Sequence, residues 1–97
     1  MYVWYGTYKK VGTRAKGDAA GWLDSGAPER GGRLPVNTSG GLLSKGEPLG
    51  ASSLGQVVEA YWQLRGEAGP RQLEKARVAL CHTVGRGANA CVIILRR

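Results

Sequence analysis

The chain has 97 residues and a mass of 10.3 kDa, which limits it to one domain or part of one. Its apolar fraction of 42% and mean hydropathy of -0.26 are typical of a globular protein, and no apolar run approaches the roughly 18–20 residues of a membrane-spanning helix. Fourteen Lys and Arg face seven Asp and Glu, a net charge of +7, but the basic residues are scattered, so we expect a solvated surface rather than nucleic-acid binding.

The first half of the chain is predicted to contain little regular structure. Residues Tyr2–Lys10 are rich in Tyr, Trp, Val and Thr, which favours a strand. Gly12–Arg33 is dense in Gly, Asp, Ser and Pro and is predicted to be a long irregular connection with a short turn around Trp22–Leu23. Leu34–Asn37 is predicted to be a short extended segment, and Thr38–Gly50 a structured glycine-rich loop.

A helix is predicted to follow this loop and to run to about Arg65. Ser52 or Ser53 can cap it, and Gln56 stands three residues after Ser53, as a capping box requires. Gly66 is expected to end it. The expected apolar face recurs at helical spacing and consists of Leu54, Val57, Val58, Tyr61 and Leu64.

The C-terminal segment is predicted to be a β-hairpin. After one or two helical turns over Arg71–Ala76, Arg77–Val84 and Ala90–Leu95 have the composition of strands that are buried on both faces. The glycine-containing turn between them has hairpin length.

Cofactors and metals are not expected. The start of the sequence lacks a signal-peptide pattern, so we expect a cytoplasmic protein in which Cys81 and Cys91 are reduced. The chain has one histidine and no CxxC motif, too few ligands for a zinc site.

Two long runs of sequence carry a family resemblance. The segment VNTSGGLLSKGEPLGASSLGQVVEAYWQLRGEAG, followed by ARVALCHTVGRGANACVIIL, resembles the C-terminal end of thiolases, in the sterol-carrier-protein-x-like or lipid-transfer branch. The likeness is strong over about Gly31–Leu95 and weaker over Ala15–Arg30.

The resemblance implies an α/β fold, represented here by a truncated C-terminal unit of strand, glycine-rich loop, helix and β-hairpin. Residues 31–97 would form this domain, and residues 1–30 would be a poorly assigned strand and long loop. A thiolase subunit is several times longer, and the half that carries its acyl-accepting cysteine has no counterpart here. Cys81 and Cys91 do not stand in that nucleophile's motif and are expected to be small core residues.

One thiolase loop usually reads GHPxG, and its histidine donates a hydrogen bond to the thioester oxygen. Here the loop is Gly46–Glu47–Pro48–Leu49–Gly50, so the resemblance makes Glu47 a candidate catalytic residue and Gly46 a candidate substrate-binding residue. An ionised carboxylate only accepts hydrogen bonds, and losing such a donor costs about 10²–10³ in rate. Two interpretations remain: a loop no longer used in catalysis, or an altered chemistry with Glu47 as base.

The second family motif is CHTVGRG. His82 matches the histidine of the lipid-transfer branch, which makes it a catalytic candidate, and Thr83 stands where the asparagine of that branch would be. Gly85 and Gly87 keep the close backbone approach to an acyl group and are candidate substrate-binding residues. His82 is alternatively a packed strand histidine, or part of an active site shared with another chain.

The resemblance therefore implies an acyl-CoA acyltransferase domain that is inactive without a partner chain and acts on a coenzyme A thioester. The alternatives are a non-catalytic scaffold or partner-binding module of an acyl-CoA enzyme, and a subunit of a thiolase-like retro-aldolase. Expected partners are a second copy of the chain, a chain of the thiolase N-terminal type, and a zinc-ribbon/OB-fold acyl-CoA-binding protein.

Overall fold

The structure, a computed structural model, describes residues 17–85 and 89–97. The chain divides into two compact units, Tyr2–Thr38 and Ser39–Arg97, which are described separately. The strand expected over Tyr2–Lys10 lies outside the described residues.

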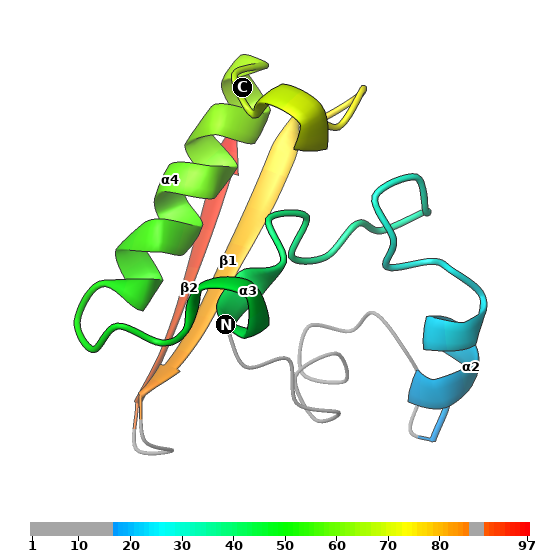
Figure 1. The fold of residues 1–97 in the computed structure, drawn as a ribbon, viewed down its shortest axis with the longest axis horizontal. Coiled ribbons are helices and arrows are strands. Elements are labelled where there is room, and N and C mark those ends of the chain that lie inside the picture. Colours follow the sequence, from blue (N-terminus) through cyan, green and yellow to red (C-terminus); the bar gives the residue numbers. More distant parts are fainter. Residues whose placement is uncertain (1–16, 86–88) are drawn as a thin grey trace. The chain divides into compact units, whose positions relative to one another are not determined.

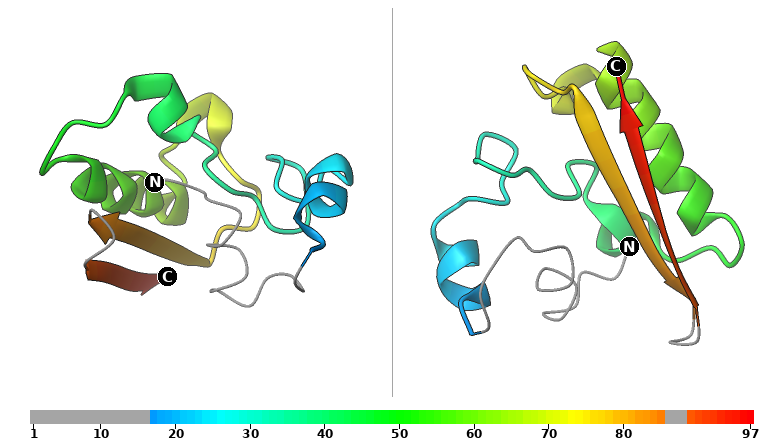
Figure 2. Two further views of the ribbon diagram at one scale, coloured as in Figure 1. Left: turned by 90° about the horizontal axis from the view of Figure 1, so that it is seen from below. Right: turned by 180° about the vertical axis from the view of Figure 1, so that it is seen from behind.

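The unit Ser39–Arg97 is a helix packed on a β-hairpin. Helix α4, Ser52–Arg65, lies along one face of strands β1, Val78–Gly85, and β2, Asn89–Arg96 (Figures 1 and 2). The strands are antiparallel and pair residue for residue from Val78 opposite Arg96 to Gly85 opposite Asn89, with no bulge. This mixed helix and strand content confirms the expected partial α/β unit, and the helix and hairpin lie within one or two residues of their predicted bounds.

Glycine ends α4 as predicted, but the predicted capping box does not form. Ala51 occupies the N-cap position, and no side-chain hydrogen bond caps the helix there. At the other end Gly66 takes a left-handed conformation (φ 78°), which lets Gly66 N–H donate to Gln63 O and Glu67 N–H donate to Trp62 O. These two bonds form a Schellman motif, which satisfies the carbonyls of Gln63 and Trp62 near the end of α4.

The predicted buried face of α4 is only partly confirmed. Leu64 is buried as predicted, and Val57 and Val58 are half-buried, but Leu54 is 64% and Tyr61 51% exposed. The helix buries Ala60 and Gln63 in addition. A small residue at position 60 lets the helix backbone approach β1. Tyr61 instead lies on the outer side of the helix beneath the guanidinium of Arg65, 5.4 Å from its ring centre.

The helix predicted over Arg71–Ala76 is wrong. Only the 3-10 turn η1, Gly69–Arg71, is helical there. The side chain of Gln63 binds Arg71 O and Leu73 N–H, two backbone groups that a continuing helix would have used itself.

Two predicted loops contain short helices. Helix α3, Gly41–Lys45, forms one turn inside the loop Thr38–Gly50 and is closed by the bond from Gly46 N–H to Leu42 O (2.7 Å). In the unit Tyr2–Thr38, helix α2, Ala19–Asp24, replaces the predicted short turn, and Leu34–Asn37 forms no strand. Helices of one or two turns are too short to produce a recognisable hydrophobic period, and the glycine-rich composition of these segments indicated loops instead.

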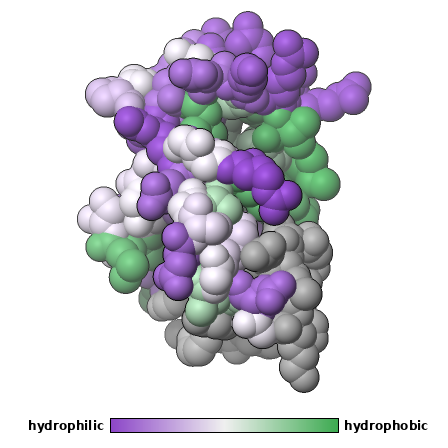
Figure 3. Space-filling view, turned by 90° about the vertical axis from the view of Figure 1, so that its right-hand side faces the viewer, coloured by the Kyte–Doolittle hydropathy of each residue, from purple (hydrophilic) through white to green (hydrophobic). Residues whose placement is uncertain are grey.

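The hairpin is not covered on both faces as its composition predicted. The outward face, opposite α4, is exposed at Val78, Leu80, Val84, Val92 and Ile94. The end of the unit where α4 ends and β1 begins is hydrophilic, at the top of Figure 3. Its exposed charged residues are Arg65, Glu67, Glu74, Lys75, Arg77, Arg96 and Arg97. No described helix is long and apolar enough to cross a membrane.

Candidate functional site

The segment Gly46–Gly50 leads from α3 into α4. Pro48 O accepts hydrogen bonds from Ala51 N–H and Ser52 N–H (both 3.1 Å), which starts the helix immediately after the motif. Glu47 is exposed. Within the described part of the chain its carboxylate has no hydrogen-bond or ion-pair partner, so its oxygens are open to solvent.

A basic side chain beside this segment was not singled out from the sequence. The ammonium of Lys45 lies against the first turns of α4: a Cβ built on Gly55 would be 2.6 Å from Lys45 Nζ. The glycine therefore leaves the space that the lysine fills. Neither residue stands out in the sequence, because the contact depends on how α3 and α4 are placed within the unit.

His82 lies in the middle of β1 and is 7% exposed. The neighbouring Cys81 contacts the helix, its Sγ donating to Gln56 O at 3.6 Å. Since side chains alternate across a strand, His82 points to the face away from α4, where Val92 is its cross-strand partner. Glu47 is thus exposed in a loop and His82 is buried in a strand, and no hydrogen bond joins these two described residues.

The two cysteines differ in environment. Cys81 is buried, and burial raises the pKa of its thiol, which keeps it neutral and poorly nucleophilic. Cys91 is exposed and lies opposite Thr83, and both cysteines are free thiols. The expectation of a core position therefore holds for Cys81 and is wrong for Cys91.

The glycines of the second motif flank the hairpin turn. Gly85 closes the ladder opposite Asn89, whose side-chain amide occupies the place that a Cβ at Gly85 would need. Gly87 lies outside the described residues. Among residues 17–85 and 89–97, no three His, Cys, Asp or Glu side chains come together in a way that could hold a metal ion.

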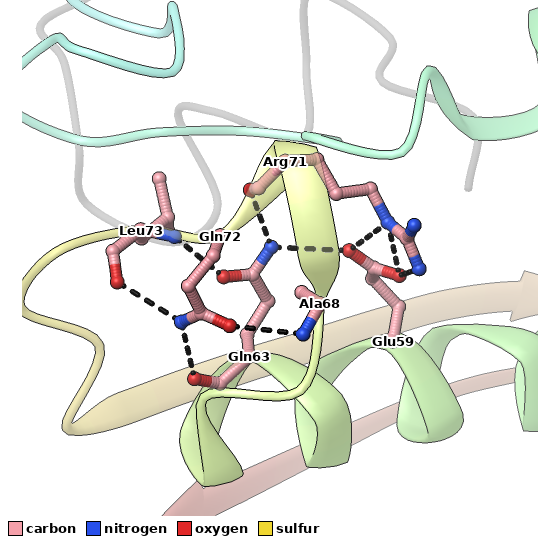
Figure 4. A network of polar contacts seen from close by, with 6 residues as sticks. All are labelled: Glu59, Gln63, Ala68, Arg71, Gln72 and Leu73. Carbon is pink, nitrogen blue, oxygen red and sulfur yellow. Dashed lines mark hydrogen bonds and ion pairs between the residues drawn. The ribbon is translucent and has the colours of Figure 1, made fainter.

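A polar network joins α4 to the segment that enters β1 (Figure 4). Gln63 Nε2 donates to Arg71 O (2.8 Å) and to Glu59 Oε1 (3.2 Å), and Gln63 Oε1 accepts from Leu73 N–H (2.9 Å). Gln72 also takes part in the network through both ends of its side-chain amide. Its Oε1 accepts a hydrogen bond from Ala68 N–H (3.0 Å), and its Nε2 donates to Gln63 O (2.9 Å) and to Leu73 O (3.0 Å).

An ion pair extends the network. The guanidinium of Arg71 binds both carboxylate oxygens of Glu59 at 2.8–2.9 Å and lies 5.5 Å from the ring centre of Trp62. The hydrogen bond to Glu59 raises the pKa of Arg71, so this charge stays in place at every ordinary pH. The network fixes the path from α4 to β1, the strand that carries His82.

Comparison with known proteins places these features in a family. A family model described as "Thiolase C-terminal domain-like" matches residues 3–97. The chain is 48% identical over 90 residues to sterol carrier protein 2 of Rattus norvegicus, a match that covers 93% of this chain and 16% of that protein. It is 43% identical over 88 residues to an acetyl-CoA acetyltransferase of Methanothermobacter thermautotrophicus, covering 90% of this chain and 23% of that protein.

A third relative is the benzoylsuccinyl-CoA thiolase subunit BbsB of Thauera aromatica, 36% identical over 84 residues, which cover 86% of this chain and 22% of that protein. The chain thus spans between 16% and 23% of the length of these three relatives.

Proposed function

Because the chain belongs to the thiolase C-terminal domain-like family, we propose that it supplies the C-terminal part of an acyl-CoA acyltransferase site and needs a second polypeptide for the nucleophile. The observation that carries this proposal is the state of the thiols. Cys81, the one cysteine in the family's second motif, is buried with a raised pKa, the opposite of what a thioester-forming nucleophile requires.

Glu47 and His82 are the proposed contributions to catalysis. Glu47 stands at the position of the thiolase histidine, and an exposed, ionised carboxylate accepts hydrogen bonds but cannot donate one to a thioester oxygen. We therefore propose that the chain is inactive alone and weak even with its partner. Gly46, Gly85 and Gly87 are proposed to bring backbone N–H groups close to the acyl group.

A coenzyme A thioester is the proposed substrate. The Lys45 ammonium lies at the first turns of α4, and the N-terminus of that helix also carries partial positive charge. Both favour an anionic ligand, which agrees with a phosphate-bearing thioester. The proposed partners are a thiolase N-terminal-type chain and, from the branch resemblance, a zinc-ribbon/OB-fold acyl-CoA-binding protein.

A non-catalytic role is the second candidate, because one observation favours it. Exposed apolar side chains on the outward face of the hairpin, among them Leu80 and Val92, offer a surface for another protein without using Glu47. On this alternative the chain would scaffold an acyl-CoA enzyme.

The test is complementation. The chain is mixed with the remaining part of the archaeal acetyl-CoA acetyltransferase, expressed as a separate polypeptide, and thiolysis of acetoacetyl-CoA is followed with free CoA. Glu47→His should raise turnover by about 10²–10³, since it restores a hydrogen-bond donor. Glu74→His, on an exposed residue outside the motif, is the matched control and should change nothing.

The outcomes separate the two candidates. A complex whose turnover rises only with Glu47→His supports the acyltransferase proposal. A complex that Glu47→His leaves inactive favours the scaffold. Failure to form any complex contradicts the dependence on a thiolase N-terminal-type chain.

A further inference from the structure

Cations outnumber carboxylates where α4 ends and the hairpin begins and ends. We refer to this surface, at the top of Figure 3, as the basic end. Its cations are Arg65, Lys75, Arg77, Arg96 and Arg97, and its carboxylates are Glu67 and Glu74. The motif Gly46–Gly50 precedes the other end of α4, and the 14 residues of that helix span about 21 Å at 1.5 Å per residue. The basic end is therefore distinct from the surface proposed for the acyl group.

The fold itself accounts for two of the five cations. Arg65 pairs with Glu67 (2.8 Å), and Arg97 Nη1 donates to Leu64 O (3.1 Å). Both guanidinium groups lie at the C-terminal end of α4, where partial negative charge favours cations. The other three cations have no hydrogen-bond or ion-pair partner among residues 17–85 and 89–97; they are Lys75, Arg77 and Arg96.

Arg77 and Arg97 form a like-charged pair across the two strands. Arg97 N–H donates to Arg77 O (3.0 Å), which continues the ladder by one step, so the two residues stand directly opposite each other. Side chains in such a pair project from the same face of the sheet, and like charges there are destabilising. Because Leu64 O holds the Arg97 guanidinium in place, Arg77 lies beside a fixed positive charge. An anion between the two groups would remove this repulsion, and a carboxylate matches the donors of a guanidinium.

We propose that the basic end is a docking site for an acidic segment of a partner protein. One carboxylate of the segment binds between Arg77 and Arg97, and further carboxylates bind at Lys75 and Arg96. Charge complementarity carries the proposal, since the surface holds five cations against two carboxylates, one of which is already paired. The net charge of +7 also attracts an acidic segment at long range.

Nucleic acid fits this surface less well than an acidic protein segment does. Glu67 and Glu74 lie among the cations and would repel the uniformly charged phosphate backbone of a nucleic acid. A protein segment avoids this repulsion, because it can place neutral or basic residues opposite the two glutamates. The proposal goes beyond the acyl chemistry and does not depend on it, so its failure would leave the proposed function untouched.

The test measures binding of an end-blocked hexaglutamate peptide to the 97-residue chain by isothermal titration calorimetry under reducing conditions. Binding should saturate and should weaken as salt rises, because salt screens the attraction. Arg77→Gln and Arg96→Gln each remove one charge from the basic end but no side-chain bond, so both variants should fold. Each should weaken binding about twofold to fivefold, as expected of one exposed ion pair, and the double variant about tenfold.

A matched control and a second measurement separate docking from attraction by net charge. Arg33→Gln removes the same charge from an exposed residue of the unit Tyr2–Thr38 and should leave peptide binding unchanged. Arg77→Gln also removes the like-charged pair, so the melting temperature of the free chain should stay the same or rise. The peptide should raise the melting temperature of the wild type more than that of Arg77→Gln, since a ligand stabilises the fold that binds it.

Several results would overturn the proposal. They are a peptide that does not bind, binding that salt leaves unchanged, and an Arg33→Gln variant that loses as much affinity as Arg77→Gln. Two further probes test the chemistry of the ligand. A single-stranded oligothymidylate of equal charge that binds more tightly than the peptide would assign the surface to nucleic acid instead. Inorganic phosphate that binds as tightly as the peptide would reduce it to a site for a small anion.

Discussion

Replacing Gln63 by leucine removes the centre of the polar network between α4 and β1. Gln63 is 6% exposed, and its loss leaves Arg71 O and Leu73 N–H without the partners they have at 2.8 and 2.9 Å. A backbone group left unsatisfied in a partly buried place costs about 1–3 kcal/mol. We expect Gln63→Leu to lower the free energy of unfolding by about 2–4 kcal/mol, a large share of the roughly 5–15 kcal/mol of a small domain.

The same helix offers a matched control. Gln56 Oε1 is buried and has no hydrogen-bond partner among the described residues. Gln56→Leu makes the same chemical change but removes an unsatisfied acceptor, so it should be neutral or stabilising. The free energies of unfolding of both variants are measured by urea titration monitored by circular dichroism. Equal losses of stability, or a loss below about 0.5 kcal/mol for Gln63→Leu, would refute the reasoning.

The remaining stability predictions concern the helix face and the thiols. Ala60→Asp buries a charge against the hairpin and should cost several kcal/mol in thermal unfolding, whereas Leu54→Asp, at an exposed position, should stay within about 0.5 kcal/mol; equal costs would mean that the face is misassigned. Cys91 should react quickly with a thiol reagent in the native state and Cys81 only after unfolding; equal rates would contradict its burial. Because the pKa of Cys81 is raised in the fold, its contribution to stability is present below the unfolded pKa of about 8.5 and is lost as pH rises toward the folded value. The stability difference between wild type and Cys81→Ala should therefore shrink in alkaline solution.

The local signals in the sequence predicted the elements with strong patterns. The β-branched run Ala90–Leu95 and the glycine at position 66 are sufficient to locate β2 and the end of α4. The predicted helix face was right for Leu64 and wrong for Leu54 and Tyr61, which hydrophobicity alone favoured. The helix instead buries a small residue, Ala60, and Gln63, whose side-chain polar atoms all form hydrogen bonds. Such choices depend on partners distant in sequence.

Less of the candidate site than of the fold could be predicted from the sequence. Glu47 and His82 were found only through a family resemblance, because neither stands in a cluster of chemical groups within this chain. The contact of Lys45 with the start of α4 has no sequence signal, since it requires the glycine at position 55 and the turn of α3 together. Cys91 is exposed although it stands in an apolar run whose composition predicted burial.

We infer that this chain lacks its own thioester chemistry. The most direct measurement is cleavage of acetoacetyl-CoA by the purified 97-residue chain in the presence of free CoA. We predict a rate equal to that of a control without protein, since Cys81 is buried with a raised pKa and an ionised Glu47 cannot donate a hydrogen bond to an oxyanion. Turnover above about 1 s⁻¹, the low end for ordinary enzymes, would contradict it.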